Sequence, residues 1–346
     1  MQSFIIKKRR IGFNEIPLVI AELGINHFGS LELAIDLCDK AIDSGVEAIK
    51  YQSHCLEDEM SIEAKKISPG NDKRNIYDVI KSSILSENEE KILSKYILQK
   101  NKILVATPFS RLAVKRIIKN NVDIIKIGSG ECNNYPFVNY ISKFKKPVIM
   151  STGMNTCDSI KQSVNYLTKF KKPLVLLHCT NVYPLQYKDV NLNALKSIKK
   201  NFKNIILGYS DHTPGIEVSL AAISLGANVI EKHFTDTKKR KGPDITSSIT
   251  PKELNNLINL SKNVFQSLGN INKKPVNSEN MTINFAFSSV STLKNIKKGE
   301  LFSDDNIFPM RPIGGDFKPK DFNKLIGKKA KIDIPKLTQL KKKHVC

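Results

Sequence analysis

The chain has 346 residues, of which 40% are hydrophobic and 25% charged, and its formal net charge at pH 7 is +22; this is ordinary for a globular protein with one large domain and a small one. Six irregularly spaced cysteines and the lack of a long apolar stretch argue against a disulfide framework, a structural zinc site, a signal peptide and a membrane span, so we expect a soluble cytoplasmic protein without a membrane partner. The basic clusters at 7–10, 238–241 and 341–343 lack interleaved aromatic residues, which indicates solvated surfaces and no nucleic-acid partner.

Eight short apolar runs, rich in Val and Ile, are predicted to be strands. In chain order they are residues 17–23, 47–52, 102–108, 123–129, 147–153, 174–180, 205–211 and 228–234. Stretches with helical periodicity follow them, for example 30–45, 157–170 and 214–226. Apolar strands joined by helices are typical of a parallel sheet covered by helices. Eight such units in roughly 250 residues predict an α/β fold of the (β/α)8 TIM-barrel type.

Two segments depart from this regular spacing. The polar insert at about 53–85, between the second and third strands, is expected to form an active-site loop. After the last barrel helix, residues 271–282 have the Pro, Asn and Lys content of a linker. We therefore predict a barrel domain over 1–270, a linker over 271–282 and a small second domain over 283–346.

The motif GYSDHT at 208–213 raises the question of a Ser/Asp/His hydrolase triad. Members of such a triad meet in space from separate parts of a fold, so their adjacency in sequence argues against one. Because side chains alternate along a strand, Ser210 and His212 share one face while Asp211 points the other way.

Every second residue of each predicted strand defines one face, and polar residues occur on this face near each strand's end. They are Glu22, Lys50, Gln52, Thr107, Lys126, Ser151, Asn181, Ser210, His212, Glu231 and His233. Burying several charges is costly unless they pair or meet a ligand. Because active sites of TIM barrels lie at the carboxyl ends of the strands, this set predicts an active site there.

His212 and His233 end consecutive strands on the same face, so their rings should converge in a barrel. Two imidazoles with carboxylates nearby, from Glu22, Glu231 or Asp244, suit a divalent transition metal such as Mn, Fe or Zn. His178 is interpreted as a core or helix-facing residue. His27 and His54 lie in loops after strands and could touch substrate, although a structural role is favoured.

Lys50 and Lys126 have two interpretations. Either lysine could form a Schiff base with a carbonyl substrate, or both could stay charged and hold a phosphate or carboxylate. The turn GSGE at 128–131 offers Ser129 and backbone N–H groups, which favours an anion site.

At these residues the sequence resembles the sialic acid synthase family. The motifs that carry the resemblance, in chain order, are AELGINHFGS, KIGSGECNNYP, STGMN, LHCTNVYP, GYSDHT, IEKHFTD, GPDI, IKKGELFSDDNI and RPIGGDF. The resemblance implies a TIM barrel followed by an antifreeze-like (SAF) domain of the β-clip type. It implies an enzyme that condenses phosphoenolpyruvate with N-acetylmannosamine to give N-acetylneuraminate and phosphate, with cleavage of a C–O bond.

The resemblance also implies roles for individual residues. A divalent metal, usually Mn²⁺ with Mg²⁺ or Co²⁺ as alternatives, would be held by His212 and His233. The phosphoenolpyruvate site would use Lys50, Thr107, Lys126, Ser129, Ser151, Asn181 and Ser210. The sugar site would use Gln52, Tyr183, Asp244 and Arg311, the last contributed by the antifreeze-like domain across a domain-swapped homodimer. Glu22 and Glu131 are candidates for positioning the sugar and for proton transfer.

Rival interpretations remain at this point. The family includes legionaminic and pseudaminic acid synthases, which use 2,4-diacetamido hexoses, and RPIGG at 311–315 differs from the more common RPGNG-like form. A Schiff-base aldolase is a less favoured enzyme, and a nucleic-acid-binding protein on an inactive barrel is a non-enzymatic alternative.

Overall fold

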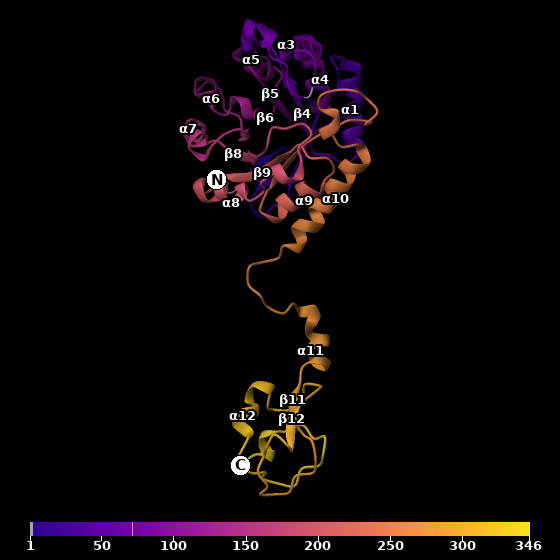
Figure 1. The fold of residues 1–346 in the computed structure, drawn as a ribbon, viewed down its shortest axis with the longest axis vertical. Helices are drawn as coiled ribbons and strands as arrows, with labels where there is room; N and C mark the ends of the chain where they lie inside the picture. The colour runs from indigo at the N-terminus through magenta and orange to yellow at the C-terminus, as the bar shows by residue number, and fades with distance from the viewer. Residues whose placement is uncertain (1–2, 71) are drawn as a thin grey trace. The chain divides into compact units, whose positions relative to one another are not determined.

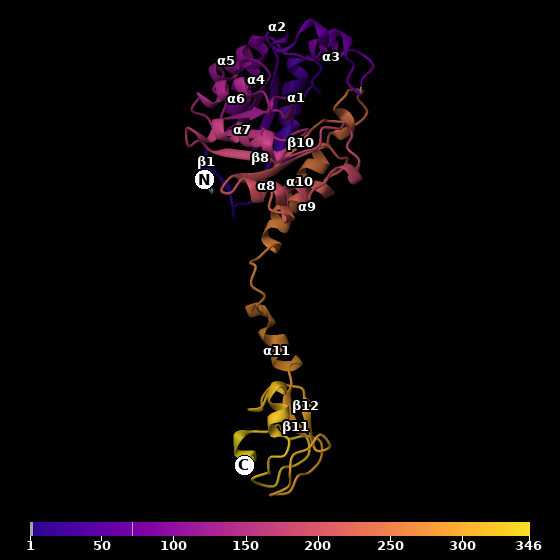
Figure 2. The ribbon, with the colours of Figure 1, turned by 60° about the vertical axis from the view of Figure 1, so that its left-hand side comes forward.

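The eight predicted runs form eight parallel strands that close into a barrel in the computed structural model, which describes residues 3–70 and 72–346. Figures 1 and 2 show the barrel surrounded by its helices. The strands are β3 (Leu18–Glu22), β4 (Ala48–Ser53), β5 (Ile103–Pro108), β6 (Ile124–Ile127), β7 (Val148–Ser151), β8 (Leu174–His178), β9 (Ile206–Asp211) and β10 (Val229–His233). β10 pairs with β3 and closes the barrel, which confirms the predicted TIM-barrel fold.

Amphipathic helices cover the outside of the barrel. They are α1 (Leu31–Asp43), α4 (Glu87–Gln99), α5 (Arg111–Lys119), α6 (Tyr135–Ser142), α7 (Cys157–Thr168), α8 (Ala194–Asn201), α9 (Glu217–Ser224) and α10 (Pro251–Ser267). Local sequence sets where several of them begin: Ser30 caps α1, and Ser86 forms a capping box with Glu89 at the start of α4. Their buried faces and the outward residues of the strands form the larger hydrophobic core.

A hairpin that the sequence analysis did not predict precedes the barrel. It consists of β1 (Ser3–Ile6) and β2 (Arg9–Gly12), and Arg9 in the basic cluster forms an ion pair with Glu47. Phe4 and Ile11 of the hairpin pack with the inward-facing residues at the amino-terminal ends of the strands. We call this cluster the apolar layer; it contains Phe4, Ile11, Leu18, Ile20, Ala48, Ile103, Val105, Ile124, Ile149, Val175, Leu177, Ile206 and Val229.

The insert between β4 and β5 contains short helices rather than a loop alone. They are α2 (Leu56–Glu59), the 3-10 helix Ile62–Lys66 and α3 (Ile76–Lys81). A small hydrophobic cluster of Ile25, Leu56, Val79 and Ile80 joins the insert to the loop after β3. The insert therefore has its own packing at the carboxyl-terminal side of the barrel.

The chain divides into two compact units between Gly269 and Asn270. The second unit contains the 3-10 helix Asn277–Glu279, α11 (Asn280–Ala286), the antiparallel strands β11 (Ser289–Thr292) and β12 (Ile307–Met310), and α12 (Phe322–Leu325). It has its own core around Val290, Phe302 and Leu340. The range 271–282, predicted to be a linker, thus includes helical turns. Across the described residues, no helix combines the length and the apolar character that crossing a membrane requires.

Candidate active site

Polar side chains replace apolar ones on the inward face of the strands at their carboxyl-terminal ends. Above the apolar layer they surround a cavity of about 140 Å³, lined by Glu22, Lys50, Gln52, Thr107, Phe109, Lys126, Gly128, Ser129, Gly130, Ser151, Cys179, Asn181, Tyr183, Ser210, His212, Glu231 and His233. The structure thus brings twelve predicted site residues to one cavity, including both histidines and both lysines. Gln52, Phe109, Asn181, Tyr183 and His233 also line an adjoining hollow of about 570 Å³.

Four charged residues at the base of this cavity form what we call the charged layer: Glu22, Lys50, Lys126 and Glu231. Lys50 Nζ lies 2.9 Å from Glu22 Oε2 and 3.5 Å from Glu231 Oε1, and Lys126 Nζ lies 3.6 Å from Glu231 Oε1. All four are almost completely buried, so two cations and two carboxylates balance within the protein. Such pairing is what makes buried charge tolerable.

The electrostatics of the charged layer shift three pKa values. Burial alone would lower the pKa of Lys50, but Glu22 and Glu231 raise it above its usual value. Burial would raise the pKa of Glu231, but Lys126 and Lys50 lower it to about 2. Burial lowers the pKa of Lys126, although Glu231 opposes this shift. Glu231 therefore stays ionised as the shared counter-charge of two lysines.

The wall beside Lys126 is a chain of small polar groups. Gly153 N–H donates to Ser129 Oγ at 3.1 Å, Ser129 Oγ lies 3.0 Å from Cys179 Sγ, and the Cys179 thiol donates to Asn181 Oδ1 at 3.0 Å. A Cβ at Gly153 would lie 2.1 Å from Asn181 Oδ1, so only glycine fits there. Sequence reasoning missed Cys179, although it follows β8 with the same parity as Asn181.

One hydroxyl of this wall has no partner of its own. Within the described part of the chain, Ser151 Oγ is buried without a hydrogen-bond partner. Lys50 Nζ, in contrast, donates to Thr107 Oγ1 at 3.2 Å. A buried hydroxyl facing a cavity beside two lysines can donate to an anionic ligand.

His212 and His233 converge as predicted, with ring centroids 5.5 Å apart. His212 Nδ1 lies 2.9 Å from the Thr180 carbonyl oxygen and must donate to it, which leaves Nε2 as an acceptor 3.1 Å from the Tyr183 hydroxyl. Burial and the neighbouring His233 lower the pKa of His212 to about 3, so the ring is neutral. A neutral imidazole fixed through its other nitrogen is the usual form of a metal-binding histidine.

His233 supplies the second imidazole. Its Nδ1 lies 3.4 Å from Asp244 Oδ2 without hydrogen-bond geometry. Gly24 permits this approach, since a Cβ there would lie 2.6 Å from Asp244 Oδ2 and 3.0 Å from His233 Nδ1. Among the described residues, no three His, Cys, Asp or Glu side chains are arranged to hold an ion. The two rings are the residues that could hold a divalent cation here, and they would leave its other positions open.

A buried ion pair lies behind the two histidines and answers the question raised by GYSDHT. Asp211 and Lys232 are register partners on β9 and β10, they point away from the cavity, and Lys232 Nζ lies 3.2 Å from Asp211 Oδ2. Asp211 also accepts from Ser219 Oγ at 2.6 Å. The residues before the histidines thus hold the strand ends together, and no Ser/Asp/His triad forms.

Three predicted site residues, Glu131, Arg311 and Asp244, do not line the cavity. Glu131 accepts from Asn134 Nδ2 at 2.6 Å and borders a neighbouring hollow with Asp58 and Glu59. Burial raises the pKa of Glu131 above its usual value. Arg311 lies exposed in the second unit. The proposed roles of Glu131 and Arg311 stay predictions. Asp244 lies beside His233 and lines the adjoining hollow.

Comparisons with known proteins agree with this geometry. The model of the NeuB family matches residues 37–273, and that of the SAF domain matches residues 288–345. The chain is 39% identical to N,N'-diacetyllegionaminic acid synthase of Campylobacter jejuni, over 86% of this chain and 91% of that protein. It is 30% identical to N-acetylneuraminate-9-phosphate synthase of Homo sapiens, over 94% of this chain and 92% of that protein.

A solved structure is similar over the barrel and beyond. It is the N-acetylneuraminic acid (sialic acid) synthetase from Leptospira borgpetersenii in complex with citrate. The identity is 31% and the TM-score 0.73, with 82% of this chain and 95% of that chain covered.

Proposed function

This chain belongs to the NeuB family, as its motifs predicted, and from that premise we propose that it condenses phosphoenolpyruvate with an N-acylated hexose. The products would be a nine-carbon 2-keto sugar acid and phosphate. The observation that carries the proposal is the cavity in which two buried lysines face two converging histidines. The lysine side of the cavity suits an anion, and the histidine side suits a carbonyl oxygen.

Phosphoenolpyruvate would bind against the charged layer. Lys50 and Lys126 provide two cations, and Ser129, Ser151 and Asn181 provide short polar groups around them. Thr107 and Ser210 complete the set proposed for this substrate; each contacts the charged layer, Thr107 through Lys50 and Ser210 through Glu231. A phosphate and a carboxylate on one small molecule match two neighbouring lysines.

The sugar would occupy the adjoining hollow, next to Gln52, Tyr183 and Asp244. Its aldehyde would face the two histidines, His212 and His233, which would hold a divalent cation, with Mn²⁺ expected and Mg²⁺ or Co²⁺ as alternatives. When bound, such a cation supplies Lewis-acid polarisation of a carbonyl oxygen. Arg311 of the SAF domain, contributed across a domain-swapped homodimer, is proposed to contact the sugar's N-acyl group.

The proposed reaction forms one C–C bond and breaks one C–O bond. The methylene carbon of phosphoenolpyruvate attacks the aldehyde carbon, whose oxygen takes up a proton and becomes a hydroxyl. Water adds to C2 and loses a proton, which gives a C2 hydroxyl. This hydroxyl loses its proton as phosphate leaves with the electrons of the C2–O bond, and the 2-keto group results. Glu22, which lies between Lys50 and Gln52, is proposed to position the sugar and transfer a proton, and Glu131 is a second candidate for proton transfer.

N-Acetylmannosamine is the first candidate for the hexose because the segment GECNNYP at 130–136 resembles the neuraminate branch. A 2,4-diacetamido hexose is the second candidate because the 39% identical relative is a diacetyllegionaminic acid synthase. Pseudaminic acid synthases are a further branch of the same reaction type.

The test is phosphate release from phosphoenolpyruvate with Mn²⁺, comparing N-acetylmannosamine with 2,4-diacetamido hexoses. We expect release to require both a hexose and a divalent cation, and EDTA to abolish it. Borohydride trapping of a substrate adduct on Lys126 or Lys50, together with turnover that survives EDTA, would favour a Schiff-base aldolase instead.

A further inference from the structure

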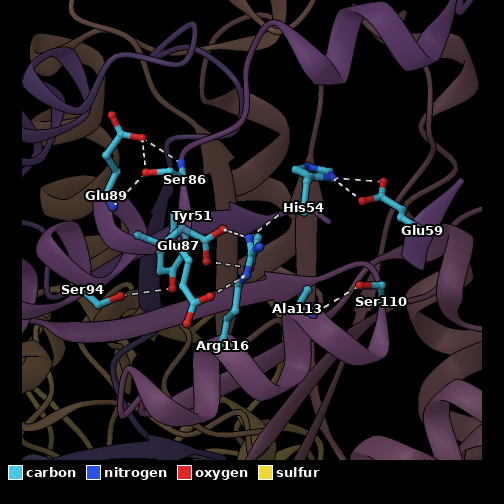
Figure 3. Close-up of polar contacts among 12 residues, drawn as sticks. Tyr51, His54, Glu59, Ser86, Glu87, Glu89, Ser94, Ser110, Ala113 and Arg116 are labelled. Carbon is cyan, nitrogen blue, oxygen red and sulfur yellow. Dashed lines mark hydrogen bonds and ion pairs between the residues drawn. The ribbon is translucent and has the colours of Figure 1, made fainter. Parts of the chain in front are cut away.

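His54 lies directly behind the cavity wall, at the start of the insert, and its ring is held on three sides. It stacks on Phe109, with ring centroids 4.4 Å apart and an interplanar angle of 7°. Its Nδ1 lies 2.9 Å from one carboxylate oxygen of Glu59 and 3.0 Å from the other, as Figure 3 shows. Its Nε2 lies 3.1 Å from Gln52 Oε1. The side chain is 5% exposed, so these contacts fix it.

The contacts of Gln52 determine which atoms around His54 donate hydrogen bonds and which accept them. Gln52 Nε2 donates to Glu22 Oε1 at 2.7 Å, while Glu22 Oε2 pairs with Lys50. Because the Gln52 amide nitrogen is committed to a carboxylate, its oxygen must face His54 as an acceptor. Nε2 of His54 must therefore donate, and Nδ1 must also donate because it faces the Glu59 carboxylate. Both ring nitrogens therefore face oxygen acceptors.

Glu59 is in turn fixed by its neighbour on the insert. Asp58 Oδ2 accepts from Leu112 N–H at 2.7 Å, which attaches α2 to the first turn of α5. This hydrogen bond lowers the pKa of Asp58. The position of Glu59 therefore depends on the barrel's outer helices and on the fold of the insert.

We propose that His54 and Glu59 are positioning residues, which orient the Gln52 amide and, through it, the Glu22 carboxylate at the edge of the cavity. A glutamine amide can turn over and exchange its oxygen and nitrogen. Here Glu22 requires the amide nitrogen as a donor and His54 requires the amide oxygen as an acceptor, so only one orientation satisfies both contacts. The proposal rests on the proposed function, because Gln52 and Glu22 matter for turnover only if a sugar binds beside them.

The matched variants are His54→Leu, His54→Gln, Glu59→Gln and Glu57→Gln. A glutamine at 54 can keep a donor near the place of Nε2, whereas a leucine cannot. Losing one hydrogen bond of this kind corresponds to about a threefold to tenfold effect. We expect His54→Leu to raise the KM for the hexose about threefold to tenfold and to lower kcat about threefold to tenfold. The KM for phosphoenolpyruvate should stay within about twofold of wild type.

The pattern across the series distinguishes positioning from general damage. We expect His54→Gln to recover most of both parameters and Glu59→Gln to show an intermediate loss. Glu57 lies exposed on the same helix, so Glu57→Gln should match wild type. Thermal unfolding of each variant shows whether it folds. A folded His54→Leu with both parameters within twofold of wild type overturns the proposal.

A second measurement is independent of activity. The chain has six histidines, so ¹⁵N-histidine spectra of the full chain at neutral pH should be assignable with His54→Gln. From these contacts we expect an N–H signal at both ring nitrogens of His54 in wild type and at one ring nitrogen in Glu59→Gln. A His54 ring with one bare nitrogen in wild type overturns the proposal. If wild type releases no phosphate with any hexose tested, the proposed function fails, and the spectrum still decides the state of His54.

Discussion

The apolar layer draws on all eight strands of the barrel, whereas the charged layer lies further along four of them, β3, β4, β6 and β10. The apolar layer fills the amino-terminal half of the barrel interior with Val, Ile and Leu and is covered by Phe4 and Ile11 of the hairpin. The charged layer, two residues further along each of its four strands, contains Glu22, Lys50, Lys126 and Glu231. Burial of apolar surface stabilises the first layer, whereas desolvation of charge opposes the second. Stability and chemistry are therefore separated along the barrel axis.

The largest effect should come from removing a cation of the charged layer. We expect Lys126→Met to lower turnover by at least about 100-fold, because a buried group that faces the anionic substrate is lost. The unfolding free energy should change far less, since Glu231 keeps Lys50 and Ser210 as partners. Phosphate-release kinetics and urea unfolding check both parts. Lys95→Met, on the exposed face of α4, is the control, and turnover of Lys126→Met within tenfold of wild type would contradict the separation.

The next effect concerns the balance of charge within that layer. Glu231→Gln leaves Lys126 without its nearest carboxylate, so we expect a loss of about 3–5 kcal/mol in unfolding free energy. Added phosphate should restore part of this loss, because an anion can replace the missing charge. Ser210→Ala, which removes only a hydrogen bond to Glu231, should cost about 1 kcal/mol. Urea unfolding with and without phosphate is the measurement, and equal stability of Glu231→Gln and wild type would argue against the ion pairs.

A substitution in the apolar layer should lower the unfolding free energy and leave turnover nearly unchanged. Ile11→Ala should cost about 2–4 kcal/mol of unfolding free energy, because it leaves a cavity beneath the strands. The kcat of the folded enzyme should stay within about twofold of wild type. Ile5→Ala, at a position on the same hairpin that is 58% exposed, should change stability by less than about 0.5 kcal/mol. A large fall in kcat for Ile11→Ala would show that the two layers are coupled.

The smallest effect tests whether counter-charges, rather than burial, keep the carboxylates of the charged layer ionised. Glu90, on the outer side of the barrel wall, is as buried as Glu231. Among the described residues its polar partners are Ser53 at 2.7 Å and Arg116 at 3.5 Å, and no lysine pairs with it. Burial raises the pKa of Glu90 to about 7, against the opposing effects of Ser53 and Arg116. Folding therefore favours protonation, and the stability that this contributes is present below pH 4.5 and lost as the pH rises through 7.

Comparison of wild type with Glu90→Gln measures this difference. The stability of wild type relative to the variant should fall by on the order of 1–3 kcal/mol between pH 4.5 and pH 7.5. Urea unfolding at the two pH values provides the result. If the unfolding free energies of the two proteins changed equally between the two pH values, Arg116 would suffice to keep Glu90 ionised.

Alternation along the strands made the barrel and most of its cavity predictable from sequence. All eight runs are strands, and one parity places Lys50, Lys126, His212 and His233 at the same cavity. The hairpin was missed because its apolar residues Phe4 and Ile11 are separated by a run of four basic residues. The two strands are too short for a hydrophobic period to be recognised in the sequence.

Position is less predictable from sequence where it depends on tertiary contacts. Glu131 belongs to a family motif, and the turn after β6 places it beside Asn134 and outside the lining of the cavity. The contacts of His54 with Phe109, Glu59 and Gln52 join a strand end, a loop and the insert. Sequence spacing gives no information about such contacts, so His54 was interpreted as structural.

The filled amino-terminal half of the barrel also limits the order in which two substrates could enter the cavity. With Phe4 and Ile11 closing that end, the lysines are reached from the mouth at the carboxyl ends of the strands, past Gln52 and Tyr183. A hexose seated at the mouth would obstruct the path of phosphoenolpyruvate to the deeper position. We therefore expect a compulsory sequence in steady-state kinetics, in which phosphoenolpyruvate enters first and the sugar second.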